Sequence, residues 1–388
     1  MADHSKAKTS KNSALLAITI LIVSIGISLF VSEFVLRWFA PQDLTGSFHE
    51  RSVDGLILNR SNYATIHSFG KIRANYRINK LHLRGGEIDY KKRKVLVLGD
   101  SFTFGWLLPE DKTYVDRLQA FADGDPEFAN HQILNGGVGG HGTASQLLFL
   151  EHYLSLIQPD AVLVFLNGDD IGRSIKTRFY TNIHSTGYEL QFNPGERVPK
   201  IEFLMNLKKM LVSLPLVDSL LTHSHLVQLI RKFFTVSRFT LVRNSGVVNV
   251  PEKGPGSQDI ISSEHTIRLG KSLFKRMKKM CDQAGIPLMV LTTGYFHSDG
   301  SNEVTRGFLL NAEGIFSALK IPFKDLYPLV AGNPDYHSQD LIIPGEGHPS
   351  ALGAKLVADA AWPWLRSQLS AHTSKLLLNK NENTVPVF

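Results

Sequence analysis

Cysteine is almost absent from this chain of 388 residues, since Cys281 is its only thiol. A single cysteine cannot form a disulfide within the chain or a cysteine-based metal centre, so both are excluded. Cys281 is expected to be a buried structural thiol. Internal repeats and low-complexity tracts are also absent, which excludes a repeat architecture.

Long runs of one charge are missing as well. The formal net charge is +7, but the longest basic run is Lys91–Lys94. Lysines and arginines are otherwise scattered, so no nucleic-acid partner is expected and the run is interpreted as solvated surface. At 43% hydrophobic residues the chain can bury one sizeable core and still carry an accessory region.

One long apolar run is present, at the amino terminus. Residues 13–32 carry no charge and are dense in Leu, Ile and Val, and they are long enough to cross a bilayer as a helix. Lys6, Lys8 and Lys11 precede the run, so residues 1–12 are expected to stay in the cytoplasm. The remainder of the chain is then expected to lie outside the cytoplasmic membrane.

A cleaved signal peptide is the alternative interpretation of this run. Signal peptides usually have a shorter apolar region that ends at a small-residue cleavage site. Here the apolar character continues past Glu33 to Trp38, a residue suited to a membrane interface. An uncleaved anchor over residues 13–38 is therefore favoured.

Strands that alternate with helices dominate the rest of the chain. Residues 41–92 are interpreted as a lead-in with short strands near 76–78 and a turn at Gly85–Gly86. From residue 93 to 370 the alternation predicts an α/β domain with a parallel sheet. We expect strands at 95–98, 132–134, 161–166, 287–291 and 322–326, and helices at 113–122, 143–157, 264–284, 304–319 and 351–369.

Residues 171–265 interrupt this alternation. They begin polar and loop-like and become amphipathic over residues 201–239. Structural packing is one interpretation, and a cap over the functional site is the other, because long insertions are often functional. The polar tail over residues 371–388 is expected to be poorly ordered.

The most informative segment is Val95–Leu98 followed by Gly99, Asp100 and Ser101. It predicts a buried strand, a sharp turn, and a serine at the carboxyl end of the strand, where open α/β sheets place their sites. Asp100 and Ser101 could simply cap the following helix. They could also present a nucleophilic hydroxyl.

A candidate base for that hydroxyl is His348, in the glycine-rich loop before the last helix. Acyl transfer by serine requires a base that removes its proton and donors that bind the oxyanion. Glu346 lies two residues earlier and is suited to orient the imidazole. Donors could come from two loops at strand ends, 135–143 and 167–170. The first is glycine-rich, but it lacks the lysine and the spacing of a phosphate-binding loop.

Four segments in order resemble the SGNH (GDSL-type) hydrolases. They are Gly99–Ser101, the glycine loop around Gly140, the loop 167–170, and His348–Pro349. The likeness covers roughly residues 76 to 368 and is weakest across the insertion. The chain also resembles bacterial membrane-anchored members, in which a segment similar to Tyr76–Gly85 precedes the strand that leads to the serine. The family implies a flavodoxin-like three-layer α/β/α fold.

The resemblance also implies roles for individual residues. Ser101 corresponds to the nucleophile and His348 to its general base, and the backbone N–H groups of Ser101 and Gly140 correspond to two oxyanion donors. Two positions depart from the pattern. The family's third donor is an asparagine where this chain has Asp169, so Asn167 would have to supply the amide, or Asp169 would have to be protonated. The family's aspartate three residues before the histidine is replaced by Gly345, so the imidazole would be oriented by Glu346, one residue nearer, or by a water molecule or a backbone carbonyl.

These residues predict a membrane-anchored serine esterase that needs neither a metal nor an organic cofactor. Its location outside the membrane suggests acylated envelope glycans or lipids as ester substrates. One alternative is an O-acyltransferase that passes the acyl group to an envelope polysaccharide. Another, motivated by Asp169 and Gly345, is a catalytically weak domain that binds envelope glycan or assists assembly.

Overall fold

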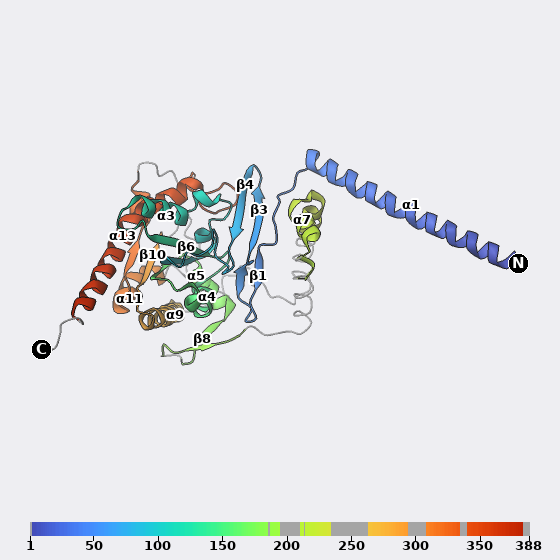
Figure 1. Cartoon of the computed structure of the whole chain (residues 1–388). Coiled ribbons are helices and arrows are strands. Elements are labelled where there is room, and N and C mark those ends of the chain that lie inside the picture. Colours follow the sequence, from blue (N-terminus) through green and yellow to red (C-terminus); the bar gives the residue numbers. More distant parts are fainter. Residues whose placement is uncertain are drawn as a thin grey trace. The chain divides into compact units, whose positions relative to one another are not determined.

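The structure is a computed structural model that describes residues 2–184, 187–194, 210–212, 214–233, 263–293, 308–333 and 340–382. The chain divides into two units, and Figure 1 labels the helices and strands of both. The sheet unit comprises residues 48–65, 72–207 and 253–388, and the anchor unit comprises residues 1–47, 66–71 and 208–252.

A five-stranded parallel sheet lies at the centre of the sheet unit. Its strand order is β11-β10-β7-β5-β6. In chain order this is 2-1-3-4-5, the doubly wound order of flavodoxin-like folds, and it confirms the predicted α/β class. The strands are β5 (Arg93–Gly99), β6 (His131–Gly137), β7 (Ala161–Phe165), β10 (Leu288–Thr292) and β11 (Phe323–Asp325).

Helices cover both faces of this sheet because successive strand residues point to opposite sides. Val95 and Val97 of β5 pack in a core with α3 (Tyr114–Gly124) and α13 (Ala351–Glu382). Leu96 and Leu98 pack in a second core on the other face. That second core contains residues of α4 (Thr143–Ile157), α9 (Ser263–Gln283) and α11 (Ala312–Ala318). The expected three layers are therefore present.

The lead-in contributes short antiparallel strands. β1 (His49–Arg51) pairs with β2 (Ile57–Asn59), and β3 (Tyr63–Phe69) and β4 (Ile72–Ile78) form another two-stranded sheet. Gly85 has φ +114, a backbone conformation that favours glycine and suits the predicted turn.

Two expectations for the sheet unit are wrong. The insertion does not begin as a loop: it starts with α5 (Asp170–Thr177) and a hairpin of β8 (Tyr180–Asn182) and β9 (Leu190–Phe192). The tail is not irregular from residue 371, because α13 continues to Glu382 in a stretch of Leu, Lys and Asn without glycine or proline. Other short elements are α2 (Ser101–Phe104), η1 (Glu110–Lys112) and α12 (Tyr327–Ala331).

Some predicted elements fall partly outside the described residues. Of the helix expected at 304–319, residues 304–307 lie outside them. Of the amphipathic segment 201–239, residues 201–209, 213 and 234–239 lie outside them. Within that segment the structure shows α7 (Pro215–His223) and a helical stretch at 225–233, and both belong to the anchor unit.

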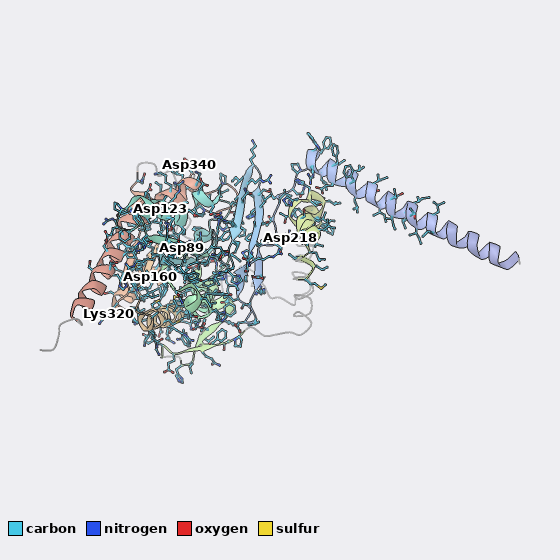
Figure 2. All side chains as sticks on the ribbon, viewed as in Figure 1. Asp89, Asp123, Asp160, Asp218, Lys320 and Asp340 are labelled. Atoms are coloured by element: carbon cyan, nitrogen blue, oxygen red, sulfur yellow. The ribbon has the colours of Figure 1, made fainter. Side chains whose placement is uncertain are left out.

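A single long helix opens the anchor unit. It is α1 (Ala2–Phe39), and its segment Leu15–Phe39 is long and apolar enough to cross a membrane. No part of that segment's apolar window is buried, and its side chains project outward along the helix (Figure 2). By length and composition a signal sequence would pass the same test.

Candidate active site

The turn after β5 fixes the position of Ser101. A Cβ at Gly99 would lie 1.9 Å from Thr103 Oγ1, so only glycine fits there. Asp100 is the N-cap of α2, and its Oδ1 accepts a hydrogen bond of 2.8 Å from the Phe102 N–H. The capping interpretation is therefore correct for Asp100. Ser101 is the first residue of α2 and is 7% exposed.

Ser101, His348 and Glu346 lie in one hydrogen-bonded line. The Ser101 Oγ and His348 Nε2 are 2.8 Å apart, although the two residues are 247 positions apart in sequence. On the other side of the ring, His348 Nδ1 contacts Glu346 Oε2. With Nδ1 protonated and donating to this carboxylate, Nε2 is left to accept the serine proton. The sequence placed these three residues as candidates, and the structure brings all three together.

The loop that carries His348 is closed by its own backbone. Ile343 N donates to His348 O at 2.8 Å, and Ile342 forms a bridge with Pro349. Gly345 and Gly347 have φ of +77 and +84, a backbone conformation that favours glycine. Gly345 thus has a conformational reason for its place in the loop, because glycine adopts this conformation at lower cost than aspartate.

Aromatic side chains hold the imidazole from the side. Trp106 stacks on His348 with ring centroids 5.5 Å apart and an interplanar angle of 25°. His49, from β1 of the lead-in, stacks on Trp106 at 6.3 Å and 15°. Phe102 also contacts the His348 ring, with centroids 5.7 Å apart. These contacts restrict rotation of the imidazole away from Ser101.

Side chains of the lead-in form hydrogen bonds with the backbone of the segment after Ser101. Arg84 is 4% exposed, and its guanidinium donates to the carbonyl oxygens of Phe104, Gly105 and Leu108 at 2.5–2.6 Å. Tyr76 Oη accepts from Leu107 N at 2.7 Å. The segment Tyr76–Gly85 therefore supports the site, because its side chains form hydrogen bonds with backbone groups of the residues that follow the candidate nucleophile.

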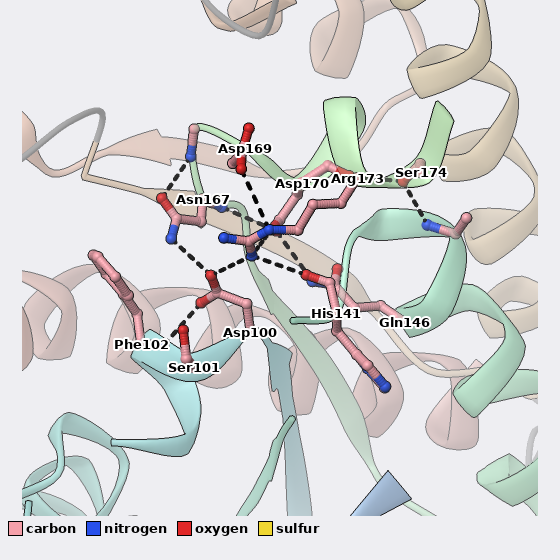
Figure 3. Close-up of polar contacts among 12 residues, drawn as sticks. Asp100, Ser101, Phe102, His141, Gln146, Asn167, Asp169, Asp170, Arg173 and Ser174 are labelled. Carbon is pink, nitrogen blue, oxygen red and sulfur yellow. Dashed lines mark hydrogen bonds and ion pairs between the residues drawn. The ribbon is translucent and has the colours of Figure 1, made fainter. Parts of the chain in front are cut away.

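Beside Ser101, an arginine is surrounded by carboxylates (Figure 3). Arg173 Nη1 lies 2.7 Å from Asp100 Oδ2 and 3.6 Å from Asp170 Oδ1, and its Nε lies 3.4 Å from Asp169 Oδ2. Burial and the charge of Asp100 raise the pKa of Asp170 well above its usual range. Burial alone would lower the pKa of Arg173, but the charges of Asp100 and Asp170 outweigh it and raise that pKa.

The loop 167–170 carries two candidate oxyanion donors, the Asn167 amide and the Asp169 carboxyl group, and both belong to this cluster. Asn167 Nδ2 donates to Asp100 Oδ2 at 2.8 Å, so its amide already has an acceptor. Asp169 faces Arg173. In this arrangement Asn167 does not supply the missing amide. The Asp169 carboxylate is partly balanced by the arginine.

Gly140, the other candidate donor, lies in the loop between β6 and α4. It has φ +81, is exposed, and has open space where a Cβ would stand. A backbone N–H at such a position is accessible to a ligand. Among the described residues, no group of three or more His, Cys, Asp or Glu side chains could hold a metal ion.

Sequence reasoning missed Arg173, Trp106 and His49. Arg173 had a readable signal, because it lies three and four residues after Asp170 and Asp169. On a helix these residues share a face, but the segment was expected to be a loop. Trp106 and His49 carried no signal, since only tertiary packing brings β1 against the site.

Comparisons with known proteins found fold neighbours alone. No family model matches the chain, and no curated protein matches it. TesA is similar in structure, with 13% identity, TM-score 0.40, and 71% of this chain and 99% of that chain covered. The psychrotrophic esterase EstA from Pseudoalteromonas sp. is similar with 13% identity, TM-score 0.40, and coverage of 72% and 100%. The acetyl xylan esterase AlAXEase follows with 13% identity, TM-score 0.38, and coverage of 70% and 98%. Because these scores are low, the function proposed below rests on the geometry of the site.

Proposed function

We propose that this chain is a serine ester hydrolase in which Ser101 is the nucleophile, His348 the general base, and Glu346 the residue that orients it. The observation that carries the proposal is the line from Ser101 Oγ to His348 Nε2, at 2.8 Å, and from His348 Nδ1 to Glu346. A serine, an imidazole and a carboxylate in this order form the arrangement that activates a hydroxyl for acyl transfer.

The reaction follows from these contacts. His348 Nε2 takes the proton of Ser101 as Oγ bonds to the ester carbonyl carbon. The backbone N–H groups of Ser101 and Gly140 stabilise the oxyanion. The C–O bond to the alcohol breaks, and the imidazolium returns its proton to that alcohol. A water molecule then gives a proton to His348 as its oxygen bonds to the acyl carbon. The bond from the acyl carbon to Ser101 Oγ breaks, the imidazolium returns its proton to Oγ, and the acid leaves. No metal or organic cofactor takes part in any of these steps.

The segment Leu15–Phe39 supports an anchored enzyme. We propose that residues 1–12 lie in the cytoplasm, that residues 13–38 span the membrane, and that the sheet unit lies outside the cell membrane. An enzyme held there meets envelope material first, so acylated glycans or lipids are the proposed substrates. Transfer of the acyl group to a polysaccharide hydroxyl would use the same residues.

One observation favours a second candidate function, a catalytically weak domain that binds envelope glycan. Asp169 stands at the sequence position that supplies an amide donor in the SGNH hydrolases, and Asn167 is held by Asp100. Loss of one oxyanion donor costs about 2.7–4 kcal/mol of barrier in other enzymes. That cost slows turnover a hundredfold or more but leaves the nucleophile reactive.

The full chain in detergent, assayed with p-nitrophenyl acetate and a fluorophosphonate probe, tests the proposal. We expect turnover, covalent labelling mapped to Ser101, and loss of both in Ser101→Ala and His348→Ala. Ser224→Ala, a serine of the anchor unit, is the matched control and should retain turnover and labelling. A folded protein that shows neither turnover nor labelling would contradict the enzyme and favour the binding domain.

A further inference from the structure

Two consecutive helices of the anchor unit expose apolar side chains. In α7 the outward residues Leu216 and Leu220 are 73% and 49% exposed. In the helical stretch 225–233, Leu229 and Ile230 are 38% and 45% exposed. On the same two helices, Thr222 and Gln228 point to other sides and are buried. Each helix therefore has an inner face that packs and an outer face that carries leucine or isoleucine.

This helix pair is fixed to the end of the apolar helix α1. The Glu33 carboxylate accepts hydrogen bonds from Ser224 Oγ at 2.8 Å, His225 N at 3.0 Å and Leu226 N at 2.9 Å. It also pairs with Arg37, one turn later on α1. Glu33 thus satisfies the first N–H groups of the stretch 225–233, where a negative charge is also favoured by the helix dipole.

A second set of bonds fixes the same stretch to the residues after α1. Gln42 N donates to His225 Nδ1 at 2.8 Å. Further along, Gln228 Nε2 and Arg231 Nη1 donate to Thr45 O at 3.1 and 2.8 Å. The helical stretch 225–233 therefore follows the chain as it leaves α1, and all of these contacts lie within the anchor unit.

The position of Glu33 sets the depth of these contacts. Six residues separate Glu33 from Phe39, the end of the apolar segment, which is about 9 Å along a helix. The segment has 25 residues, and about 20 suffice to cross the hydrocarbon core. Glu33 then lies near the boundary between acyl chains and headgroups. An unpartnered charge is costly there, and the bonds from residues 224–226 reduce that cost.

We propose that α7 and the stretch 225–233 lie on the outer surface of the lipid bilayer, with Leu216, Leu220, Leu229 and Ile230 in contact with lipid. The inference depends on the anchor but not on the esterase chemistry. The lipid surface is the proposed occupant because this helix pair is hydrogen-bonded to Glu33, which lies near the end of the apolar segment of α1. Lys232, exposed one turn after Leu229, is placed to meet anionic headgroups.

Spin labels in the full chain, reconstituted into phosphatidylethanolamine–phosphatidylglycerol vesicles, test this inference. The native thiol is buried, so labels are attached to Leu216→Cys and to Leu229→Cys. Accessibility to oxygen relative to a water-soluble nickel chelate then reports depth. Ser317→Cys, exposed on α11, is the water-facing reference, and Ile22→Cys in α1 is the membrane reference.

We expect the oxygen-to-nickel ratio at 216 and 229 to exceed that at 317 severalfold and to fall below that at 22. Glu33→Ala should lower the ratio at 229 and leave the ratio at 22 unchanged, whereas Glu33→Gln, which keeps an acceptor, should lower it less. Ratios at 216 and 229 equal to that at 317 would overturn the inference. Dipolar broadening between labels on two copies of the chain, together with oxygen-to-nickel ratios equal to that at 317, would show that this face mediates self-association. That result would also overturn the inference.

Discussion

In the proposed mechanism, Asp169 limits the rate of the reaction. Its carboxylate lies on the loop that leads from β7 into α5, and it is balanced in part by Arg173 Nε at 3.4 Å. A negative group near a developing oxyanion raises the barrier, whereas an amide donor lowers it. This residue therefore gives the sharpest test of the departure from the SGNH pattern.

We expect Asp169→Asn to raise kcat on p-nitrophenyl acetate by about a hundredfold to a thousandfold, the scale of one oxyanion donor. Asp169→Ala is the control, because it removes the charge without supplying an amide, and it should give a smaller gain. Steady-state kinetics of the three proteins measures the effect. An unchanged or lower rate in Asp169→Asn would show that this position does not limit catalysis.

Arg173 compensates buried charge beside Ser101. Asp100 and Asp170 are fully buried, and both lie within 3.6 Å of the guanidinium. Removing one partner of a buried ion pair costs about 3–5 kcal/mol. We therefore expect Arg173→Met to lower the free energy of unfolding of the sheet unit by an amount on that scale, measured by chemical denaturation.

Asp170→Asn provides the matched comparison for Arg173→Met. Burial and the charge of Asp100 raise the pKa of Asp170, which means that the surroundings disfavour its charged form, and Asp170→Asn removes that charge while keeping the shape of the side chain. A raised pKa means that its contribution to stability is complete below its unfolded pKa and is lost as pH rises through the folded pKa. Asp170→Asn should thus gain stability relative to the native chain as pH increases. The double variant Arg173→Met with Asp170→Asn should recover part of the unfolding free energy that Arg173→Met loses. Equal losses of unfolding free energy in the single variant Arg173→Met and in the double variant would contradict this account.

At the scale of elements, the site depends on close contact between β6 and α2. A Cβ at Gly137, the last residue of β6, would lie 2.1 Å from Phe104 N and 2.6 Å from Thr103 C. Asn135 supports the same contact, since its Nδ2 donates to Thr103 O at 2.9 Å. The helix that begins with Ser101 is therefore seated directly on the end of the neighbouring strand.

Gly137→Ala should displace α2 and remove Ser101 from His348. We expect a loss of about 1–3 kcal/mol or more in stability, as for overpacking in a close-packed core, together with loss of fluorophosphonate labelling. Gly124→Ala is the control, because a Cβ there meets nothing within 4 Å, and it should leave both properties unchanged. Labelling retained at the native rate in Gly137→Ala would contradict the proposed seating.

Elements also show where sequence patterns succeed. The run Val95–Leu98 predicted β5 because a strand buried on both faces is continuously apolar. The segment 171–177 was not recognised as helical because its residues are mostly polar. Its helix α5 presents Ile171 and Ser174 to the interior, and that packing is a tertiary effect.

At the scale of the whole molecule, the apolar segment Leu15–Phe39 fits both an anchor and a cleaved signal by length and composition, and we propose the anchor. We expect the mature protein to keep residues 1–40, to sediment with membranes, and to resist extraction at high pH. Intact mass measurement and carbonate extraction check this. As a control, a chain that begins at residue 42 should remain in the supernatant. A mature mass that lacks the first 30 to 40 residues would contradict the anchor.

The sequence by itself determined the class of sheet, the serine turn, the histidine loop and the apolar amino-terminal helix. Each of these depends on local rules, namely the periodicity of apolar residues, glycine at sharp turns, and the length needed to cross a bilayer. The tertiary structure alone decided which groups meet. The Asn167 amide is hydrogen-bonded to Asp100, and Arg173 lies among carboxylates. Trp106 stacks on His348, and His49 stacks on Trp106. The reason is physical: buried charges and rings are stabilised by whichever partners the fold brings within contact, and residues far apart in sequence carry no local signal of that contact.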